Sequence, residues 1–176
     1  MNFIETEIKD LFVVELNKIG DERGFFARTW CEKEFADKNL TSRMLQANTS
    51  YSKDKGTLRG LHYQLSPHEE AKLMRCIKGA IFDVAVDLRP DSETYKKWFG
   101  IELTESNRKM LFIPEGFAHG YQTLVENTEA FYMSSAFYAP EAERGLRWND
   151  PAIGINWPVT EELNITEKDQ SWADIS

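Results

Sequence analysis

Three histidines are the first residues whose chemistry can be weighed, because an imidazole can move a proton near neutral pH or bind a metal ion. His62 lies in GTLRGLHYQ and His119 lies in PEGFAHG, whereas His68, in SPHEEAK, is typical of a solvated loop histidine. Two interpretations of His62 and His119 are open. One is a pocket without a metal. The other is a metal site completed by Glu69, since two histidines and a carboxylate can form a facial iron site.

A tyrosine-rich run could supply proton donors. In AFYMSSAFY (130–138), strand alternation places Tyr132, Ser134, Ala136 and Tyr138 on one face. Two phenols separated by two small side chains would leave a concave space with a proton donor at each end. The alternative is a core tyrosine whose hydroxyl is satisfied by the backbone.

Cationic side chains near these groups could neutralise a developing negative charge. In AKLMRCIKG, Lys72 shares a strand face with two sulfur-containing side chains, and an inward lysine is costly unless it meets an anion. This face could equally be the outer one. Arg59 and His62 lie on opposite parities, so they share a pocket only if Gly60 carries a bulge or kink.

The N-terminal segment carries a second group of cations. DERGFFAR (21–28) sets Arg23 and Arg28 around two phenylalanines, one of which is Phe26. Guanidinium groups beside aromatic rings suit a diphosphate and a stacked base. The plainer interpretation, an edge strand with solvated arginines, also stays open.

The elements that must position these residues are short strands. Apolar or alternating runs separated by turn residues are typical of a β-sandwich or barrel. The expected strands are 11–16, 24–30, 43–50, 58–65, 72–77, 80–88, 98–103, 109–114, 120–125 and 130–138. Residues 31–39 form the best helical stretch. The tail from Glu141 is predicted as an irregular segment that its tryptophans pin onto the barrel.

Length and charge exclude several classes of protein. The 176 residues predict a single domain, 1–176, since about 150 residues per domain is typical. The net charge of −8 disfavours nucleic acid as a partner, because binding a phosphate backbone needs a basic stripe. No apolar run is long enough to span a membrane. Two cysteines, Cys31 and Cys76, and a first segment without a signal-peptide layout predict a reduced, cytoplasmic protein.

Several segments, taken in order, resemble one protein family. GTLRGLHYQ and PEGFAHG resemble the two signature motifs of the cupin superfamily, and the whole set resembles the dTDP-4-dehydrorhamnose 3,5-epimerase family within it. The segments are DERGFF, QANTSYS, GTLRGLHYQ, KLMRC, GAIFDVAVDLR, IPEGFAHG, the tyrosines of AFYMSSAFY, RGLRWNDP, INWP and EKDQ. The resemblance implies an all-β fold, a cupin-type double-stranded β-helix (jelly-roll) barrel with a few short helices. It also implies a homodimer with exchanged strands, no metal or organic cofactor, and a dTDP-linked 4-keto-6-deoxyhexose as substrate.

The resemblance also implies a role for each catalytic residue. His62 would be the base that removes a proton α to the ketone, and Asp169, in EKDQ, would be its carboxylate partner. Tyr132 would return a proton to the opposite face, and Lys72 would stabilise the enolate oxygen. This chemistry needs a base, an acid and a positive group at the keto oxygen. His119 would orient the sugar or the enolate.

A further set of residues falls at positions that the family uses to bind the substrate. They are Arg23, Phe26, Arg28, Gln46, Asn48, Arg59, Tyr138, Glu143, Lys168 and Trp172. Arg23 and Phe26 are expected to reach into the site of the other subunit.

One segment departs from the family pattern. After RGFF many members carry an acidic residue two places on, whereas this chain has Ala27 and then Arg28. The departure leaves the nucleotide open among dTDP, CDP and GDP. The same catalytic residues would also serve an epimerase that inverts only C3 or only C5, or a ketoisomerase. A metal-dependent cupin oxygenase or isomerase, using His62, Glu69 and His119, stays open too, as does a sugar-binding cupin without catalysis.

Overall fold

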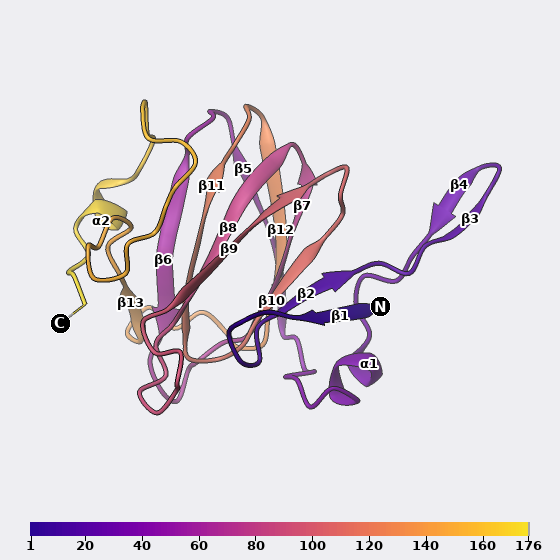
Figure 1. Cartoon of the computed structure of the whole chain (residues 1–176), viewed down its shortest axis with the longest axis horizontal. Helices are drawn as coiled ribbons and strands as arrows, with labels where there is room; N and C mark the ends of the chain where they lie inside the picture. Colours follow the sequence, from indigo (N-terminus) through magenta and orange to yellow (C-terminus); the bar gives the residue numbers. More distant parts are fainter. Residues whose placement is uncertain (176) are drawn as a thin grey trace.

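The structure of the protein, a computed structural model, describes residues 1–175 and consists mostly of β-strands (Figure 1). Two short helices occur, α1 (Glu32–Ala36) and α2 (Glu167–Gln170). No helix of the described residues has the length and apolar character needed to cross a membrane. The strands are β1 (Asn2–Glu5), β2 (Phe12–Glu15), β3 (Ile19–Asp21), β4 (Gly24–Phe26), β5 (Gln46–Ser52), β6 (Leu58–Gln64), β7 (Lys72–Lys78), β8 (Ala80–Asp87), β9 (Trp98–Thr104), β10 (Met110–Ile113), β11 (Phe117–Thr123), β12 (Thr128–Ser134) and β13 (Glu143–Gly145).

Two antiparallel sheets enclose the core. The larger sheet has six strands in the order β1-β2-β10-β7-β12-β5, and the smaller has five in the order β13-β6-β11-β8-β9. One apolar cluster joins their inner faces, with Met74 and Ile113 from the larger sheet and Ile81 and Ala85 from the smaller. Burial of these facing surfaces is the main force that holds the sheets together. The expected all-β fold with a few short helices is confirmed.

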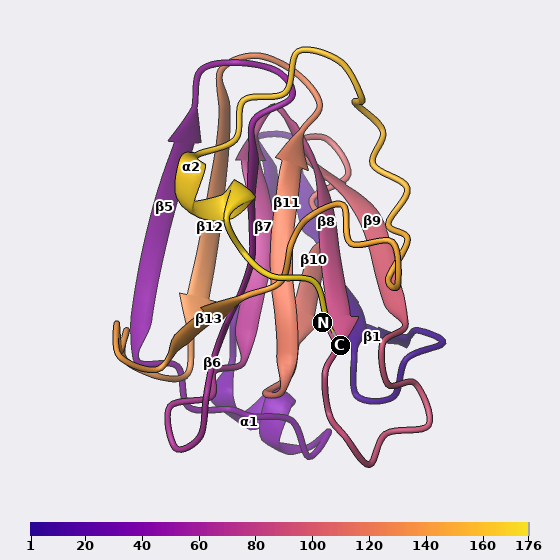
Figure 2. The same cartoon turned by 90° about the vertical axis from the view of Figure 1, so that its left-hand side faces the viewer.

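Strand β8 shows why the smaller sheet is buried on both faces. Ile81 points into the core between the sheets, whereas Val84 and Val86 pack in a second cluster with Trp157 of the C-terminal tail. The indole N–H of Trp157 donates to the carbonyl of Trp148 at 2.8 Å, which fixes the tail locally. The tail therefore covers the outer face of the smaller sheet, as predicted, and Figure 2 shows it crossing that face in orange and yellow.

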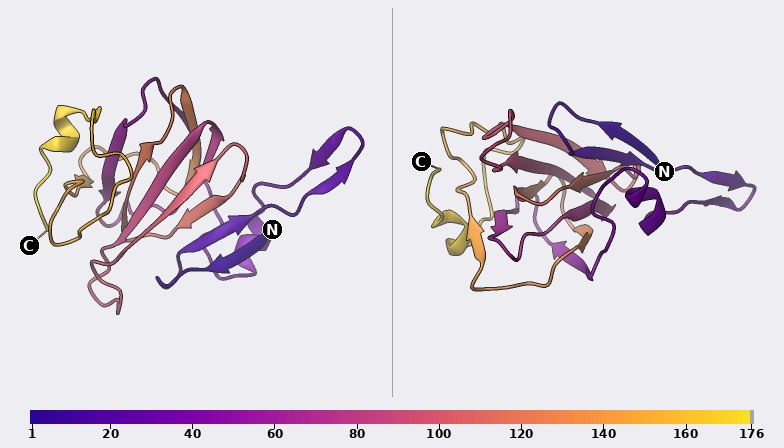
Figure 3. Two further views of the ribbon diagram at one scale, coloured as in Figure 1. Left: turned by 45° about the horizontal axis from the view of Figure 1, so that its top comes forward. Right: turned by 90° about the horizontal axis from the view of Figure 1, so that it is seen from below.

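The hairpin of β3 and β4 projects away from both sheets (Figures 1 and 3). Two of its apolar side chains lie in the open, since Ile19 is 72% exposed and Phe26 is 68% exposed. Arg23, in its turn, forms an ion pair with Asp21 of the same hairpin. The hairpin thus presents apolar and cationic side chains outside the body of this chain.

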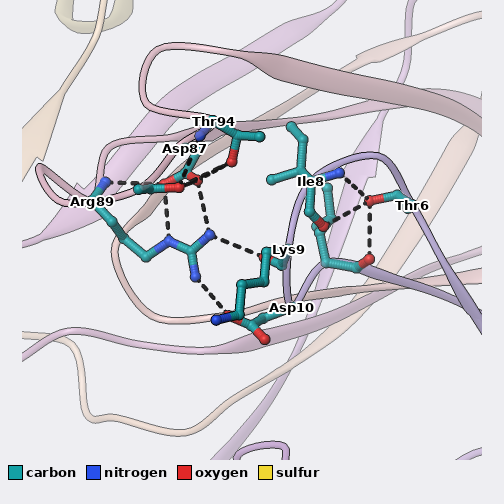
Figure 4. Close-up of polar contacts among 9 residues, drawn as sticks. Thr6, Ile8, Lys9, Asp10, Asp87, Arg89 and Thr94 are labelled. Carbon is teal, nitrogen blue, oxygen red and sulfur yellow. Dashed lines mark hydrogen bonds and ion pairs between the residues drawn. The ribbon is translucent and has the colours of Figure 1, made fainter.

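A charged cluster around the buried Asp87 ties the loop after β8 to the turn between β1 and β2 (Figure 4). The carboxylate of Asp87 accepts two hydrogen bonds from the Arg89 guanidinium, at 2.9 and 2.8 Å, and one each from the hydroxyls of Ser92 and Thr94. Arg89 also donates to the Asp10 carboxylate at 2.8 Å. Burial acts to raise the pKa of Asp87, but these donors outweigh it and lower the pKa to about 2.

Two predicted strands end earlier than expected. The strand predicted at 24–30 ends at Phe26, and the strand predicted at 130–138 ends at Ser134. The Ser134 hydroxyl hydrogen-bonds to the backbone of Ala136, which offers the chain a local turn in place of strand pairing. The prediction that Tyr138 shares a strand face with Tyr132 is therefore wrong.

Some short elements have no counterpart among the predicted ones. Strands β1, β3 and β13 and helix α2 contain three or four residues each, too few for a periodic pattern to emerge. The helix predicted at 31–39 occurs as the shorter α1. The remaining predicted strands occur, with modest shifts at their ends.

Candidate active site

A cavity of about 230 Å³ opens between the two sheets, and all four residues predicted to be catalytic line it. Its walls come from β5, β6, β7, β11, β12 and α2. The lining residues are Ser50, Arg59, His62, Lys72, Met74, His119, Gly120, Tyr121, Tyr132 and Asp169.

An outer chamber of about 400 Å³ adjoins this cavity and shares His62, Lys72 and Tyr132 with it. The other residues of the outer chamber are Gln46, Asn48, Tyr63, Gln64, Glu70, Ser134, Tyr138 and Glu143. The two chambers together form one cleft with the catalytic candidates at their junction.

A bulge at Gly60 brings Arg59 and His62 into this cleft. His62 pairs with His119 and Arg59 with Tyr121, so β6 has two residues where β11 has only Gly120 between the pairs. Gly60 has φ +124°, and a Cβ at this position would lie 2.6 Å from the Cα of Gly120. Only glycine fits there, and the kink that the two opposite parities required is confirmed.

His62 forms a short hydrogen bond with Asp169, 107 residues further along the chain, with 2.7 Å between Nε2 and Oδ1. Asp169 lies in the first turn of α2, where its backbone N–H donates to the side chain of Thr166. Its second carboxylate oxygen accepts from the backbone N–H of Gly60 at 3.3 Å. Burial acts to raise the pKa of Asp169, but the bond with His62 and its charge outweigh burial, so the pKa lies below its ordinary value.

His119 forms a second, deeper pair with Asp83 of β8, with 2.8 Å between Nε2 and Oδ1. The side chain of Asp83 is fully buried, and its other oxygen has no hydrogen-bond partner among residues 1–175. Burial raises the pKa of Asp83, and the charges of His119 and Lys72 offset this only in part. The carboxylate pKa is therefore shifted in opposite directions in the two histidine–aspartate pairs, downward for Asp169 and upward for Asp83.

Tyr132 and Lys72 face the histidines from the larger sheet. His62 stands on β6 of the smaller sheet and Tyr132 on β12 of the larger, so they approach the cavity from two sides. Burial, followed by the negative charge of Glu70, raises the pKa of Tyr132. Lys72 is 8% exposed and its Nζ lies 3.0 Å from the Glu70 carboxylate. Lys72 therefore points inward, which decides between the inner and outer faces that alternation left open.

A polar cluster borders the outer chamber. Glu143 accepts hydrogen bonds from Lys168 at 2.7 Å and from the Tyr138 hydroxyl at 2.8 Å. Burial acts to raise the pKa of Glu143, but these donors hold it below its ordinary value. The backbone N–H of Tyr138 donates to Gln46, and Trp172 meets the His62 ring edge-on at 6.4 Å. Most of the predicted substrate-binding residues thus surround one cleft.

Three of the predicted substrate-binding residues lie outside this cleft. Arg23 and Phe26 are on the projecting hairpin, and Arg28 forms an ion pair with Glu34 of α1 at 3.0 Å. None of the three lines either chamber of this chain.

The three residues of the possible metal site do not share a cavity. Glu69 lines a separate pocket with Tyr63 and Pro67, whereas His62 and His119 line the cavity between the sheets. Across residues 1–175, no three side chains of His, Cys, Asp or Glu gather in a way that could hold a metal ion.

The sequence analysis did not single out Ser50, Glu70 and Tyr121, which line the cleft, or Asp83, which pairs with His119. Asp83 had a detectable signal, because the alternation of AIFDVAVD places its carboxylate on the inner face with Ile81. Glu70 had none, since it lies in a loop beside another glutamate.

Comparison with known proteins agrees with this geometry. The family model described as dTDP-4-dehydrorhamnose 3,5-epimerase matches residues 5–176. A protein of that name from Shigella flexneri is 46% identical over 170 residues, which cover 96% of this chain and 93% of the relative.

Solved structures extend the agreement to the fold. The dTDP-4-dehydrorhamnose 3,5-epimerase of Elizabethkingia anophelis superposes with a TM-score of 0.96 at 39% identity, over 99% of this chain and 96% of that chain. The dTDP-6-deoxy-D-glucose-3,5-epimerase of Legionella pneumophila, solved in complex with dTDP-4-keto-L-rhamnose, superposes with a TM-score of 0.89 at 40% identity, over 96% of this chain and 89% of that chain. The predicted cupin-type barrel is thereby confirmed. The chain belongs to the dTDP-4-dehydrorhamnose 3,5-epimerase family.

Proposed function

We propose that this chain inverts C3 and C5 of dTDP-4-dehydro-6-deoxy-D-glucose by proton transfer, with His62 as base and Tyr132 as acid. The observation that carries the proposal is the His62–Asp169 pair facing Tyr132 across a cavity that also holds Lys72. Because Nε2 of His62 is engaged by Asp169, the ring presents Nδ1 to accept a proton. The carboxylate then stabilises the imidazolium that forms.

The ketone at C4 makes this proton transfer feasible at both neighbouring positions. Removing a proton from C3 or C5 leaves an enolate whose charge lies mainly on the C4 oxygen. The ammonium of Lys72, which is largely buried, would stabilise that oxygen. Tyr132, whose pKa is raised, stays protonated at neutral pH and can deliver its proton to the face opposite His62. His119 would orient the sugar within the same cavity.

The dTDP-linked substrate is proposed from two observations. The Legionella pneumophila relative was solved with dTDP-4-keto-L-rhamnose. In this chain, Arg59 lines the inner cavity, and Lys168 donates a hydrogen bond to Glu143, which lines the outer chamber. Two cations are therefore available to bind a diphosphate.

The reaction can be tested by proton NMR in D₂O with dTDP-4-keto-6-deoxyglucose. Deuterium entering both C3 and C5 is the expected result, whereas entry at one position would identify an epimerase of a single centre. With no exchange, the CDP- and GDP-linked sugars would be tried next, and failure with all three would overturn the proposal. His62→Ala should abolish exchange while the far-UV circular dichroism is unchanged. His68→Ala, in a loop outside the cleft, is the matched control.

We also propose a homodimer in which the hairpin of one subunit completes the site of the other. The exposed Phe26 and the cationic Arg23 lie outside any cleft of their own chain, where they could meet a nucleotide of a second copy. The outer face of the larger sheet gives further support for a contact between subunits. Arg75 has a buried Nε there without a hydrogen-bond partner among the described residues, and the nearby Ile77 is exposed. Sedimentation equilibrium should give twice the chain mass, and a monomer at all concentrations would contradict the proposal.

A cytoplasmic location is proposed on the chemistry of the cysteines. Cys31 and Cys76 are both free thiols, as expected in a reducing compartment. Burial raises the pKa of the Cys76 thiol to about 11, which leaves it unreactive in the core.

A further inference from the structure

Glu70 is a charged residue of the cleft that the proposed reaction does not use. It lies in the loop between β6 and β7 and lines the outer chamber. Its side chain is only 17% exposed, so the carboxylate is largely removed from water. Such a charge is costly to bury unless partners hold it.

Two neighbouring strands supply those partners. One oxygen of Glu70 lies 3.0 Å from Nζ of Lys72 on β7, and the other accepts a hydrogen bond from the Ser134 hydroxyl on β12 at 2.6 Å. Lys72 and Ser134 are themselves paired across the two strands. Both carboxylate oxygens are therefore fixed, and the ammonium is held at the junction of the two chambers.

We propose that Glu70 is a positioning residue for the epimerisation, which holds the Lys72 ammonium at the place where the enolate oxygen forms. The inference rests on the proposed function and adds a role for a residue outside the base, the acid and the enolate contact. Glu70 itself exchanges no proton with the sugar.

The physical reason is the balance of charge between two largely buried side chains. The side chain of Lys72 is 11% exposed, so its charge needs a permanent partner in the absence of substrate. A carboxylate nearby also opposes the formation of a phenolate. Burial is the largest cause of the raised pKa of Tyr132, and the charge of Glu70 is the next. The other titratable groups that line the two chambers are Arg59, His62, Tyr63, His119, Tyr121, Tyr138, Glu143 and Asp169, and Asp83 lies behind His119.

Three variants test the inference. Glu70→Gln keeps the shape and removes the charge, Glu70→Asp keeps the charge on a shorter arm, and Glu69→Gln removes a neighbouring charge that faces another pocket. For each, the rate of inversion is followed by NMR across pH, and folding is checked by thermal unfolding. We expect Glu70→Gln to lower kcat at least about tenfold, since the ion pair that holds the Lys72 ammonium is lost.

The pH profile separates positioning from a merely structural role. Without the negative charge, Tyr132 ionises more readily, so the alkaline fall in rate should begin at lower pH in Glu70→Gln and return toward that of the wild type in Glu70→Asp. A profile and kcat of Glu70→Gln equal to those of Glu69→Gln would overturn the inference. So would equal losses in Glu70→Gln and Glu70→Asp with an unshifted profile. An inactive wild type would instead overturn the proposed function.

Discussion

Two histidine–aspartate pairs in one cavity illustrate how residue environment separates roles. Asp169 accepts several hydrogen bonds and has a lowered pKa, so it remains a carboxylate beside His62. Asp83 is fully buried with a raised pKa and one oxygen that has no partner among the described residues. A stable carboxylate supports an imidazolium that forms during proton abstraction. This difference favours His62, rather than His119, as the base.

The acid can be tested separately from the base. In Tyr132→Phe, His62 can still remove a proton and return it to the same face, so exchange with solvent continues. Inversion should fall by about 10²- to 10⁴-fold, the usual contribution of a general acid. NMR in D₂O measures both rates in one sample. An equal loss of exchange and inversion would contradict the assignment of Tyr132.

The sequence predicted the individual residues of the site better than their partners. Residue type and spacing made His62, Tyr132 and Lys72 candidates, but strand alternation left Tyr132 and Lys72 open, and the resemblance to a family implied their roles. The partner of His62 is 107 residues away, and no spacing rule relates them, so only the resemblance to a family indicated Asp169. Glu70 was not predicted as a site residue, because its contacts are with side chains of two neighbouring strands rather than within its own segment.

At the scale of elements, a single bulge sets the geometry of the site. Gly60 turns β6 so that two side chains of opposite parity enter the same cleft, and its close contact with Gly120 leaves no room for a Cβ. This kink could be inferred from the sequence, because Arg59 and His62 have opposite strand parity and can share a pocket only if the strand is irregular at Gly60. The ends of β4 and β12 could not be inferred in this way, since local turns decide them.

The cluster around Asp87, in the loop after β8, makes the free energy of unfolding depend on pH. The pKa of Asp87 is lowered to about 2 in the folded protein, from an ordinary value of 3.8. The stabilisation is therefore present above about pH 4 and is lost as the pH falls toward 2. It amounts to about 2 kcal/mol of the free energy of unfolding.

Urea unfolding from pH 6 to pH 2.5 checks this dependence. Asp87→Asn should be less stable than the wild type at pH 6, and the gap should narrow as the pH falls. Asp10→Asn is the matched control, because Asp10 contacts the same Arg89 from a side chain that is 45% exposed, where an ion pair contributes little. A gap that stays constant across this range would contradict the prediction.

At the scale of the whole molecule, the residues proposed for catalysis and some of those proposed for nucleotide binding lie in different parts of the chain. The residues proposed as base, acid and enolate contact line the cavity between the sheets, whereas Arg23 and Phe26 belong to a hairpin that projects away from both sheets (Figure 3). In the proposed dimer each site would therefore be assembled from two chains. Arg23→Ala should weaken substrate binding about tenfold or more, through the loss of a charged contact, while the dimer persists. Isothermal titration with dTDP measures the affinity, and an unchanged Kd would contradict this role for Arg23.

The projecting hairpin has a genetic consequence. In a cell with one His62→Ala allele and one Arg23→Ala allele, the proposed dimer could contain one chain of each kind. One of its two sites would then carry both substitutions, and the other site would carry neither. Random pairing would restore about one quarter of all sites. At substrate concentrations below KM, co-expression of the two alleles should thus give faster inversion than either allele alone. A His62→Ala and Tyr132→Phe pair, with both lesions in the body of the chain, should show no such complementation, and recovery by that pair would argue against a shared site.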